Sequence, residues 1–269
     1  MAIVKGAFEL TGSFGNASFY TRRGSDKVIV RIKGGASKEK IKKSPKFEGF
    51  RLQQKEWKGC TAFASTLRYA FGGLHRLADY NITPVLNGLA KNLQKLDTEH
   101  EIGKRSIHLT GMGYTLENFN LNRTYPFNSV LRVMVQSSIN RAEGSATVVV
   151  PRIDGAIDVH NVQRLPYMRL IVSLGLISDL HYLENQLEFA PINPLVHGIT
   201  EVHTGDWSLS ETVMEAQTFT LQLDELTLAD LTDDCALILC MGIEFGKVGF
   251  TGEPQAVKYA GSARVLKVE

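Results

Sequence analysis

The sequence predicts an α+β protein, mainly β, in which a β-hairpin arm and a helical hairpin precede an antiparallel β-sandwich. Residues 105–269 alternate short apolar segments with turn residues and contain no helix of crossover length, which favours antiparallel sheets. Residues 45–96 instead repeat apolar side chains every three or four positions, as amphipathic helices do. We therefore divide the chain into residues 1–44 (hairpin and basic arm), 45–104 (helical hairpin) and 105–269 (sandwich).

The composition indicates an ordinary folded protein, with 43% hydrophobic and 22% charged residues. The sequence contains no apolar run of about 18 residues, so we expect no membrane span, and the first residues lack the pattern of a signal peptide. We expect synthesis in the cytoplasm, which is compatible with later release or incorporation into a particle. Cys60, Cys235 and Cys240 lack the spacing of a disulfide framework and are interpreted as buried side chains in a reducing compartment. Cys235 and Cys240 would point to opposite faces of a strand.

The first part of the chain predicts a hairpin, with β-like segments at residues 17–20 and 27–33 around a turn at 23–26. In the second segment Val28, Val30 and Ile32 share one face. A lone two-stranded hairpin is only marginally stable in water. We therefore expect it to pack on its own chain or to add to the sheet of a neighbour.

A basic stretch follows the hairpin. Residues 22–58 contain thirteen Lys and Arg against four Asp and Glu, a net charge of +9, whereas the whole chain carries +2. Residues 34–46 have the composition of an exposed linker rich in lysine. Two interpretations stay open, a solvated linker and an electrostatic arm that lies on an acidic surface or on phosphates.

Two helices are predicted after this arm. Ser44 is placed as the N-cap of the first, with Pro45 at its first position, and the apolar stripe runs to about residue 74. A break at Gly59 and an end at Gly72 and Gly73 are expected. The second helix covers residues 83–96. In the sandwich, the nearly continuous apolar run at residues 235–245 predicts a central strand.

The motifs of nucleotide binding, nucleophilic catalysis and zinc hydrolysis are absent, so we predict no catalytic residue and no cofactor. The best metal-like set lies on a segment where Glu201 and His203 would share a strand face, although a loop with incidental polar residues explains it much better. Its members are His197, Glu201, His203 and Asp206. An acidic run is either a solvated loop or a docking surface for a basic arm; it comprises Asp224, Glu225, Asp230, Asp233 and Asp234.

Motifs at both ends of the chain form a recognisable pattern: GSFGNASFY at 12–20, Arg23-Gly24, VIVR at 28–31, and near the end residues 234–245 with YAGSA at 259–263. With these motifs, both ends resemble a bacterial family of unassigned function. The arm departs from the family pattern, because it lacks the family's usual Asn-Pro-x-Thr and Gln-x-x-Gln-Arg run. It has Ser44-Pro45-Lys46 and, at residues 50–54, FRLQQ in that neighbourhood. The resemblance implies an immunoglobulin-like β-sandwich behind an N-terminal arm, with no assigned activity.

Our first hypothesis is a non-enzymatic, self-assembling structural protein, such as a subunit of a filament, shell or phage-like particle. The N-terminal hairpin would add to a neighbour's sheet, and the basic arm would meet acidic loops of the next subunit. A contact of this kind that does not close propagates as a polymer. The predicted interface residues are Phe19, Tyr20, Val28, Val30, Ile32, Lys38, Lys40, Lys42, Lys43, Asp230, Asp233 and Asp234.

The alternative is a nucleic-acid-binding module, because clustered cations are enough for phosphate binding. Its residues would be Lys33, Lys38, Lys40, Lys42, Lys43, Lys46 and Arg51. A third hypothesis, a metal- or carbohydrate-dependent enzyme on the sandwich, depends only on residues 197–206.

Overall fold

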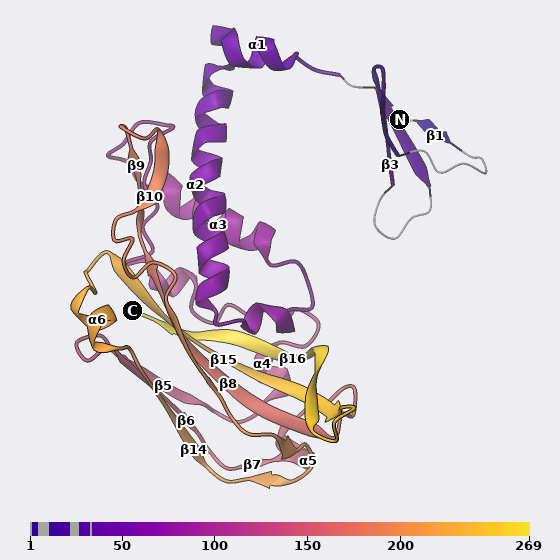
Figure 1. The fold of residues 1–269 in the computed structure, drawn as a ribbon, viewed down its shortest axis with the longest axis vertical. Helices are drawn as coiled ribbons and strands as arrows, with labels where there is room; N and C mark the ends of the chain where they lie inside the picture. The colour runs from indigo at the N-terminus through magenta and orange to yellow at the C-terminus, as the bar shows by residue number, and fades with distance from the viewer. Residues whose placement is uncertain (1, 5–10, 22–26, 33) are drawn as a thin grey trace. The chain divides into compact units, whose positions relative to one another are not determined.

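A computed structural model describes residues 2–4, 11–21, 27–32 and 34–269 (Figure 1). The chain forms two compact units, Met1–Arg51 and Leu52–Glu269. This division differs from the three predicted regions, because the helices after residue 51 share one unit with the strands. The fold is α+β and mainly β with antiparallel sheets, as predicted.

The N-terminal unit contains a four-stranded antiparallel sheet in the order β1-β4-β3-β2. The strands are β1 (Ala2–Val4), β2 (Gly12–Phe14), β3 (Ala17–Thr21) and β4 (Val28–Ile32). The predicted pairing of the last two is confirmed, with Phe19 opposite Val30. The prediction of a two-stranded hairpin was incomplete, since one further strand adds to each edge. The turn predicted at 23–26 lies outside the described residues.

The lysine-rich stretch predicted as an exposed linker is mostly exposed, but residues 38–43 form a helix that was not expected. Helix α1 (Lys38–Lys43) starts at Ser37, whose hydroxyl accepts the backbone N–H of Lys40 at 3.3 Å. Ser44 and Pro45 then begin the 3-10 turn η1 (Pro45–Phe47), which precedes helix α2 (Glu48–Ala70). The predicted positions of Ser44 and Pro45 at a helical start are therefore confirmed, but the Ser44 side chain makes no capping hydrogen bond.

Helix α2 continues through Gly59, where a break was expected. A Cβ atom at Gly59 would lie 2.6 Å from Cγ of Phe189, so glycine allows the hairpin of β9 (Leu180–Leu183) and β10 (Glu188–Pro191) to pack closely. Gly72 and Gly73 have positive φ and end the helical segment, as expected. The 3-10 turn η2 (Leu74–Leu77) and helix α3 (Thr83–Leu96) follow.

Two antiparallel sheets form most of the rest of the second unit, and β7 and β13 pair as a separate two-stranded sheet. The larger has the order β11-β8-β15-β16, with β12 on β8, and the smaller has the order β14-β6-β5. The strands of the two sheets are β5 (Gln136–Asn140), β6 (Ser145–Val150), β8 (Tyr167–Ser178), β11 (Thr200–Thr204), β12 (Ser208–Leu209), β14 (Gln217–Gln222), β15 (Cys235–Val248) and β16 (Pro254–Val268). The short elements are η3 (Gly113–Thr115), α4 (Phe127–Val130), β7 (Ile153–Asp154), α5 (Gly155–Asp158), β13 (Val213–Met214) and α6 (Glu225–Ala229).

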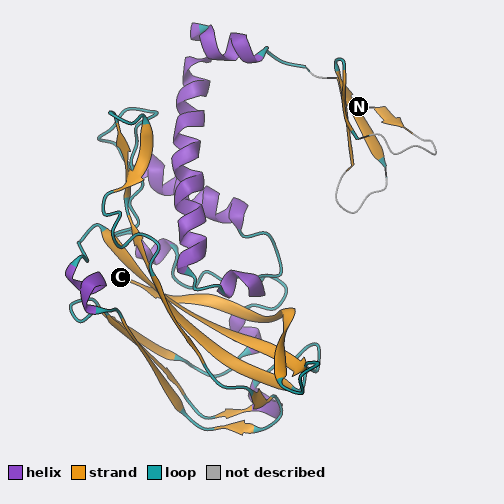
Figure 2. Cartoon of the chain, in the orientation of Figure 1, coloured by secondary structure: helices purple, strands orange, loops and turns teal. Residues whose placement is uncertain are grey.

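The larger sheet is covered on both faces, and Figure 2 shows helices on one side of it and the smaller sheet on the other. On β15, Ile238 and Cys240 pack with the helices, whereas Cys235 and Leu237 belong to the core shared with the smaller sheet. The predicted opposite placement of the two cysteines is therefore confirmed. Burial on both faces explains why this central strand is apolar at nearly every position.

A buried carboxylate joins the two helices to the segment after them. Glu56 on α2 accepts hydrogen bonds from Arg105 Nε at 2.7 Å, the Gly103 N–H at 2.9 Å and Lys91 Nζ at 2.5 Å. Burial raises the pKa of Glu56, but the hydrogen bonds from Arg105, Gly103 and Lys91 outweigh it and lower the pKa to about 2. Within the described residues, no helix is both long and apolar enough to cross a membrane.

Candidate functional site

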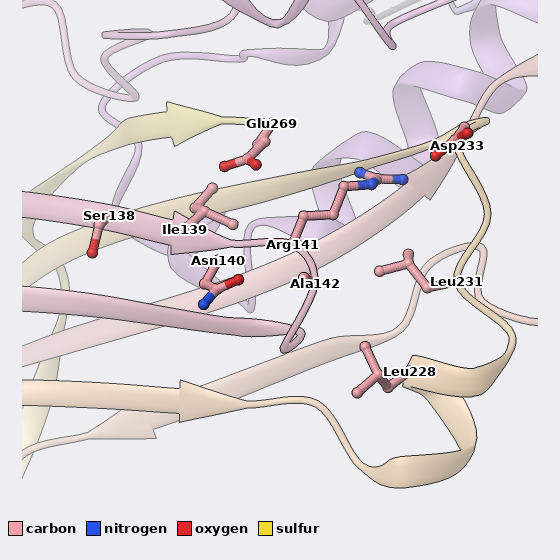
Figure 3. Close-up of a pocket in the computed structure, with 9 residues that line it drawn as sticks. All are labelled: Ser138, Ile139, Asn140, Arg141, Ala142, Leu228, Leu231, Asp233 and Glu269. Carbon is pink, nitrogen blue, oxygen red and sulfur yellow. The ribbon is translucent and has the colours of Figure 1, made fainter.

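An open groove of about 810 Å³ lies at the end of the second unit where β15 begins. Leu228 and Leu231 project toward the β5–β6 turn that carries Arg141 and Ala142 (Figure 3). The lining residues are Ser138, Ile139, Asn140, Arg141, Ala142, Leu228, Leu231, Asp233 and Glu269. The groove thus combines apolar side chains with charged ones.

Local hydrogen bonds hold the acidic loop beside the groove in place. Asp224 begins α6 by accepting the N–H of Thr227 at 2.9 Å and its hydroxyl at 2.6 Å. These hydrogen bonds from Thr227 lower the pKa of Asp224. Asn193 donates to the carbonyl of Asp230 at 2.7 Å, and Arg141 donates to the carbonyl of Thr232 at 2.6 Å. Hydrogen bonds to the rest of the second unit therefore fix the conformation of this loop.

The charge of this loop is one-sided. Residues 224–234 include five acidic side chains and no basic one, namely Asp224, Glu225, Asp230, Asp233 and Asp234. Asp233 and Glu269 line the groove itself, and Arg141 is the one cation among its described lining residues. A positively charged partner with some apolar surface suits such a groove.

The predicted residues of the N-terminal sheet fall on two faces. Cross-strand neighbours share a face, so the register places Phe19 with Val30, and Ala17 with both Phe14 and Ile32. The face that carries them also holds Val28, whereas Tyr20 pairs with Ile29 on the opposite face. Phe14 is 83% exposed and Ile32 is 76% exposed, so one row of this apolar face is open to solvent.

The predicted cations of the arm do not all have the same role. Lys38, Lys40, Lys42 and Lys43 are exposed on α1, and Lys46 is exposed on η1. Arg51 instead donates from Nη1 to the carbonyls of Ile41 at 2.8 Å and Ser44 at 2.9 Å. These bonds hold the end of α1 against the start of α2, so Arg51 has a structural role, and its predicted phosphate contact stays a prediction. Lys33 lies outside the described residues.

The metal-like set of residues 197–206 does not form a metal site. The His197 Nδ1 atom accepts the backbone N–H of Ser178 at 3.1 Å, and the His203 ring packs edge-on against Phe219 at 5.3 Å. Burial lowers the pKa of His197. Across the part of the chain that the structure describes, no three His, Cys, Asp or Glu side chains are grouped to hold a metal ion.

Sequence reasoning identified the acidic loop but missed the other walls of the groove. Ile139, Arg141 and Glu269 come from distant segments, and only the pairing of β5 with β6 and of β15 with β16 brings them near Asp233. The sequence could have predicted Leu228 and Leu231 as groove residues, since two leucines three positions apart within an acidic run indicate a one-sided apolar surface.

Comparisons of the chain with family models, with curated proteins and with solved structures find no match. The resemblance at the two chain ends therefore stays a prediction.

Proposed function

We propose that this protein is a non-enzymatic structural subunit that assembles with copies of itself, its N-terminal unit docking on the acidic groove of a neighbour. The observation that carries the proposal is the opposite charge of the two compact units. Residues 1–51 contain twelve Lys and Arg against four Asp and Glu, a net of +8. Residues 52–269 contain eighteen against twenty-four, a net of −6.

Local complementarity supports the same pairing. The N-terminal unit offers exposed lysines on α1 together with the open apolar row of Phe14 and Ile32. The groove offers Asp233 and Glu269 beside Leu228 and Leu231. Burial of the apolar side chains would supply affinity, while the charges would orient the partners and speed their encounter.

The sheet edges supply a second kind of contact. Strands β1 and β2 are the outer strands of the N-terminal sheet. Outer strands present unpaired backbone groups that another chain can pair with, unless they are covered. Because a groove-to-arm contact joins different surfaces of two copies, it propagates into a ring or a filament.

The strand order also supports an immunoglobulin-like sandwich, which is a frequent scaffold for binding surfaces. Taking β5, β6, β8, β11, β14, β15 and β16 as strands A, B, C, C′, E, F and G gives sheets E-B-A and C′-C-F-G. This order is compatible with the Greek-key arrangement of immunoglobulin-like domains and so supports that part of the proposal. The fold alone assigns no function, so the proposal depends on the surfaces described above.

Charge reversal in two separate chains tests the proposal. One chain carries Lys38, Lys40, Lys42 and Lys43 changed to Glu, and the other carries Asp230, Asp233 and Asp234 changed to Lys. Each alone is expected to be mainly monomeric by light scattering after gel filtration. An equal mixture is expected to regain large assemblies, because each reversed surface meets a complementary one on the other chain.

A matched control carries Glu99, Glu211 and Glu215 changed to Lys, which are three exposed acids away from the groove. It should assemble like the unmodified protein, and assembly should weaken as salt rises. Monomeric unmodified protein at high concentration and low salt would overturn the proposal. Failure of the mixture to assemble would overturn docking between copies.

A nucleic-acid-binding module is the second candidate, favoured by the four exposed lysines of α1. Its affinity for a generic duplex would fall steeply between about 50 and 200 mM salt, since phosphate contacts release counterions. The arm-reversed chain would lose that binding and the groove-reversed chain would keep it. Absence of binding at low salt would remove this candidate.

A further inference from the structure

Two histidines of the second unit lie in one pocket, and a buried aspartate holds each of them. The pocket has a volume of about 280 Å³ and follows the C-terminal end of α3. It is lined by Leu93, Leu96, Asp97, Thr98, Glu99, His100, His108, Thr110 and Met112. The imidazoles are about half exposed, 51% for His100 and 48% for His108, whereas the side chains of Asp97 and Asp179 are 4% and 1% exposed.

Both imidazoles use the same ring nitrogen for the carboxylate. Nδ1 of His100 lies 2.8 Å from Asp97 Oδ2, and Nδ1 of His108 lies 3.0 Å from Asp179 Oδ2. In the neutral ring, a proton on Nδ1 leaves a lone pair on Nε2. A carboxylate behind the ring is the usual support of a metal-binding histidine, because it fixes the tautomer and makes the imidazole a better donor.

The aspartates themselves are already satisfied. Asp97 also accepts the N–H groups of Glu99 at 2.9 Å, His100 at 3.1 Å and Ser106 at 2.6 Å. Asp179 also accepts the N–H groups of Leu109 at 2.7 Å and Thr110 at 3.2 Å, together with the Thr110 hydroxyl. These bonds hold the loop in shape, so the carboxylates support the histidines and are not free to bind an ion.

Besides the two imidazoles, the pocket lining includes the Met112 sulfur atom and the exposed Glu99 carboxylate. Among the described residues, no three His, Cys, Asp or Glu side chains are grouped to share an ion, so Glu99 does not join both imidazoles. Met112 lines the pocket, and its thioether accepts a hydrogen bond from the Tyr114 hydroxyl at 3.4 Å. Imidazole nitrogen together with thioether sulfur favours a soft ion such as copper(I) over calcium or magnesium, which take oxygen ligands. Acidic side chains near His108 include Asp179, Asp97 and Asp234, and their negative charge favours a bound cation over an anion.

We propose that His100, His108 and Met112 form a binding site for a soft monovalent metal ion of the copper(I) class. The ion would bind the Nε2 atoms and the thioether, with Asp97 and Asp179 behind the rings. This site is distinct from the predicted set at residues 197–206, because two imidazoles and a methionine thioether form it. It does not depend on self-assembly.

The test uses the full chain with silver(I), which has the ligand preference of copper(I) without its redox chemistry. We expect one ion to bind per chain and to shift the Met112 methyl signal in NMR. His100→Gln, His108→Gln and Met112→Leu should each weaken binding by about tenfold or more. Met112→Leu conserves volume, so folding is expected to survive it. Asp179→Asn should weaken binding less than loss of a ligand.

Two controls separate this site from other donors. His203→Gln removes an exposed histidine outside the pocket and should leave the affinity unchanged. Cys60, Cys235 and Cys240 are buried, and silver bound to them would be insensitive to the pocket variants. Absence of binding at micromolar silver, or binding that the three ligand variants leave unchanged, would overturn the proposal. Competition with a copper(I) chelator under anaerobic conditions then measures the affinity for copper(I).

Discussion

The two units of the chain differ in where they keep their apolar side chains and their charges. In the described part of the N-terminal unit, the buried apolar side chains are Val28 and Ile29, while Phe14 and Ile32 are exposed. The second unit buries both faces of its central sheet and pairs Glu56 with Arg105 and Lys91. This difference indicates that the second unit is stabilised by its own core, whereas the first exposes part of its apolar and basic surface, which is the surface that the proposed assembly uses.

The largest expected effect comes from breaking the buried ion cluster of the second unit. Glu56→Ala leaves Arg105 and Lys91 without their carboxylate, and removal of one member of a buried ion pair costs about 3–5 kcal/mol. Chemical denaturation should show this loss in the free energy of unfolding. A change below about 1 kcal/mol would mean that water replaces the carboxylate and that the cluster is not a source of stability.

Acid should weaken the same cluster. The pKa of Glu56 is about 2 in the folded chain, below its ordinary value of 4.5. Its contribution is therefore fully present above about pH 4.5 and is lost as the pH falls toward 2, by an amount on the order of 3 kcal/mol. Unfolding free energies measured between pH 6 and 3 should fall less steeply in Glu56→Gln than in the unmodified chain. Identical slopes would contradict the prediction.

A smaller effect is expected where α1 meets α2. Arg51→Ala removes both hydrogen bonds to the carbonyls of Ile41 and Ser44, each of which contributes about 1 kcal/mol. Hydrogen exchange should accelerate in α1, and the second unit should be unaffected. Arg51→Lys keeps the charge without the planar guanidinium, so it should restore only part of the protection. Equal protection in all three chains would show that packing alone holds α1.

The smallest effect on stability is expected in the exposed apolar row. Phe14→Ser and Ile32→Ser change side chains that are 83% and 76% exposed, so the free energy of unfolding should change by less than about 0.5 kcal/mol. The same pair should nevertheless reduce assembly in light scattering, because these side chains are proposed to lie in the groove of a neighbour. Unchanged assembly with unchanged stability would remove this row from the interface.

Local signals in the sequence were sufficient for much of the fold. Ser44 and Pro45 start a helical segment and Gly72 and Gly73 end one, since the fixed φ of proline and the positive φ open to glycine depend on the residue itself. The apolar run at residues 235–245 likewise predicted a central strand correctly, because a strand buried on both faces needs apolar side chains throughout. The opposite placement of Cys235 and Cys240 follows from strand geometry alone.

Other features were decided only by tertiary structure. Gly59 was expected to interrupt a helix, yet it lies within one because the ring of Phe189, from a distant hairpin, needs its lack of a Cβ. The groove and the histidine pocket join residues far apart in sequence, such as Arg141 with Asp233 and His108 with Asp179. Composition and periodicity report a residue's own preferences and those of its near neighbours. Which distant side chains meet is set by sheet order and helix packing, and in this protein that determines the candidate sites.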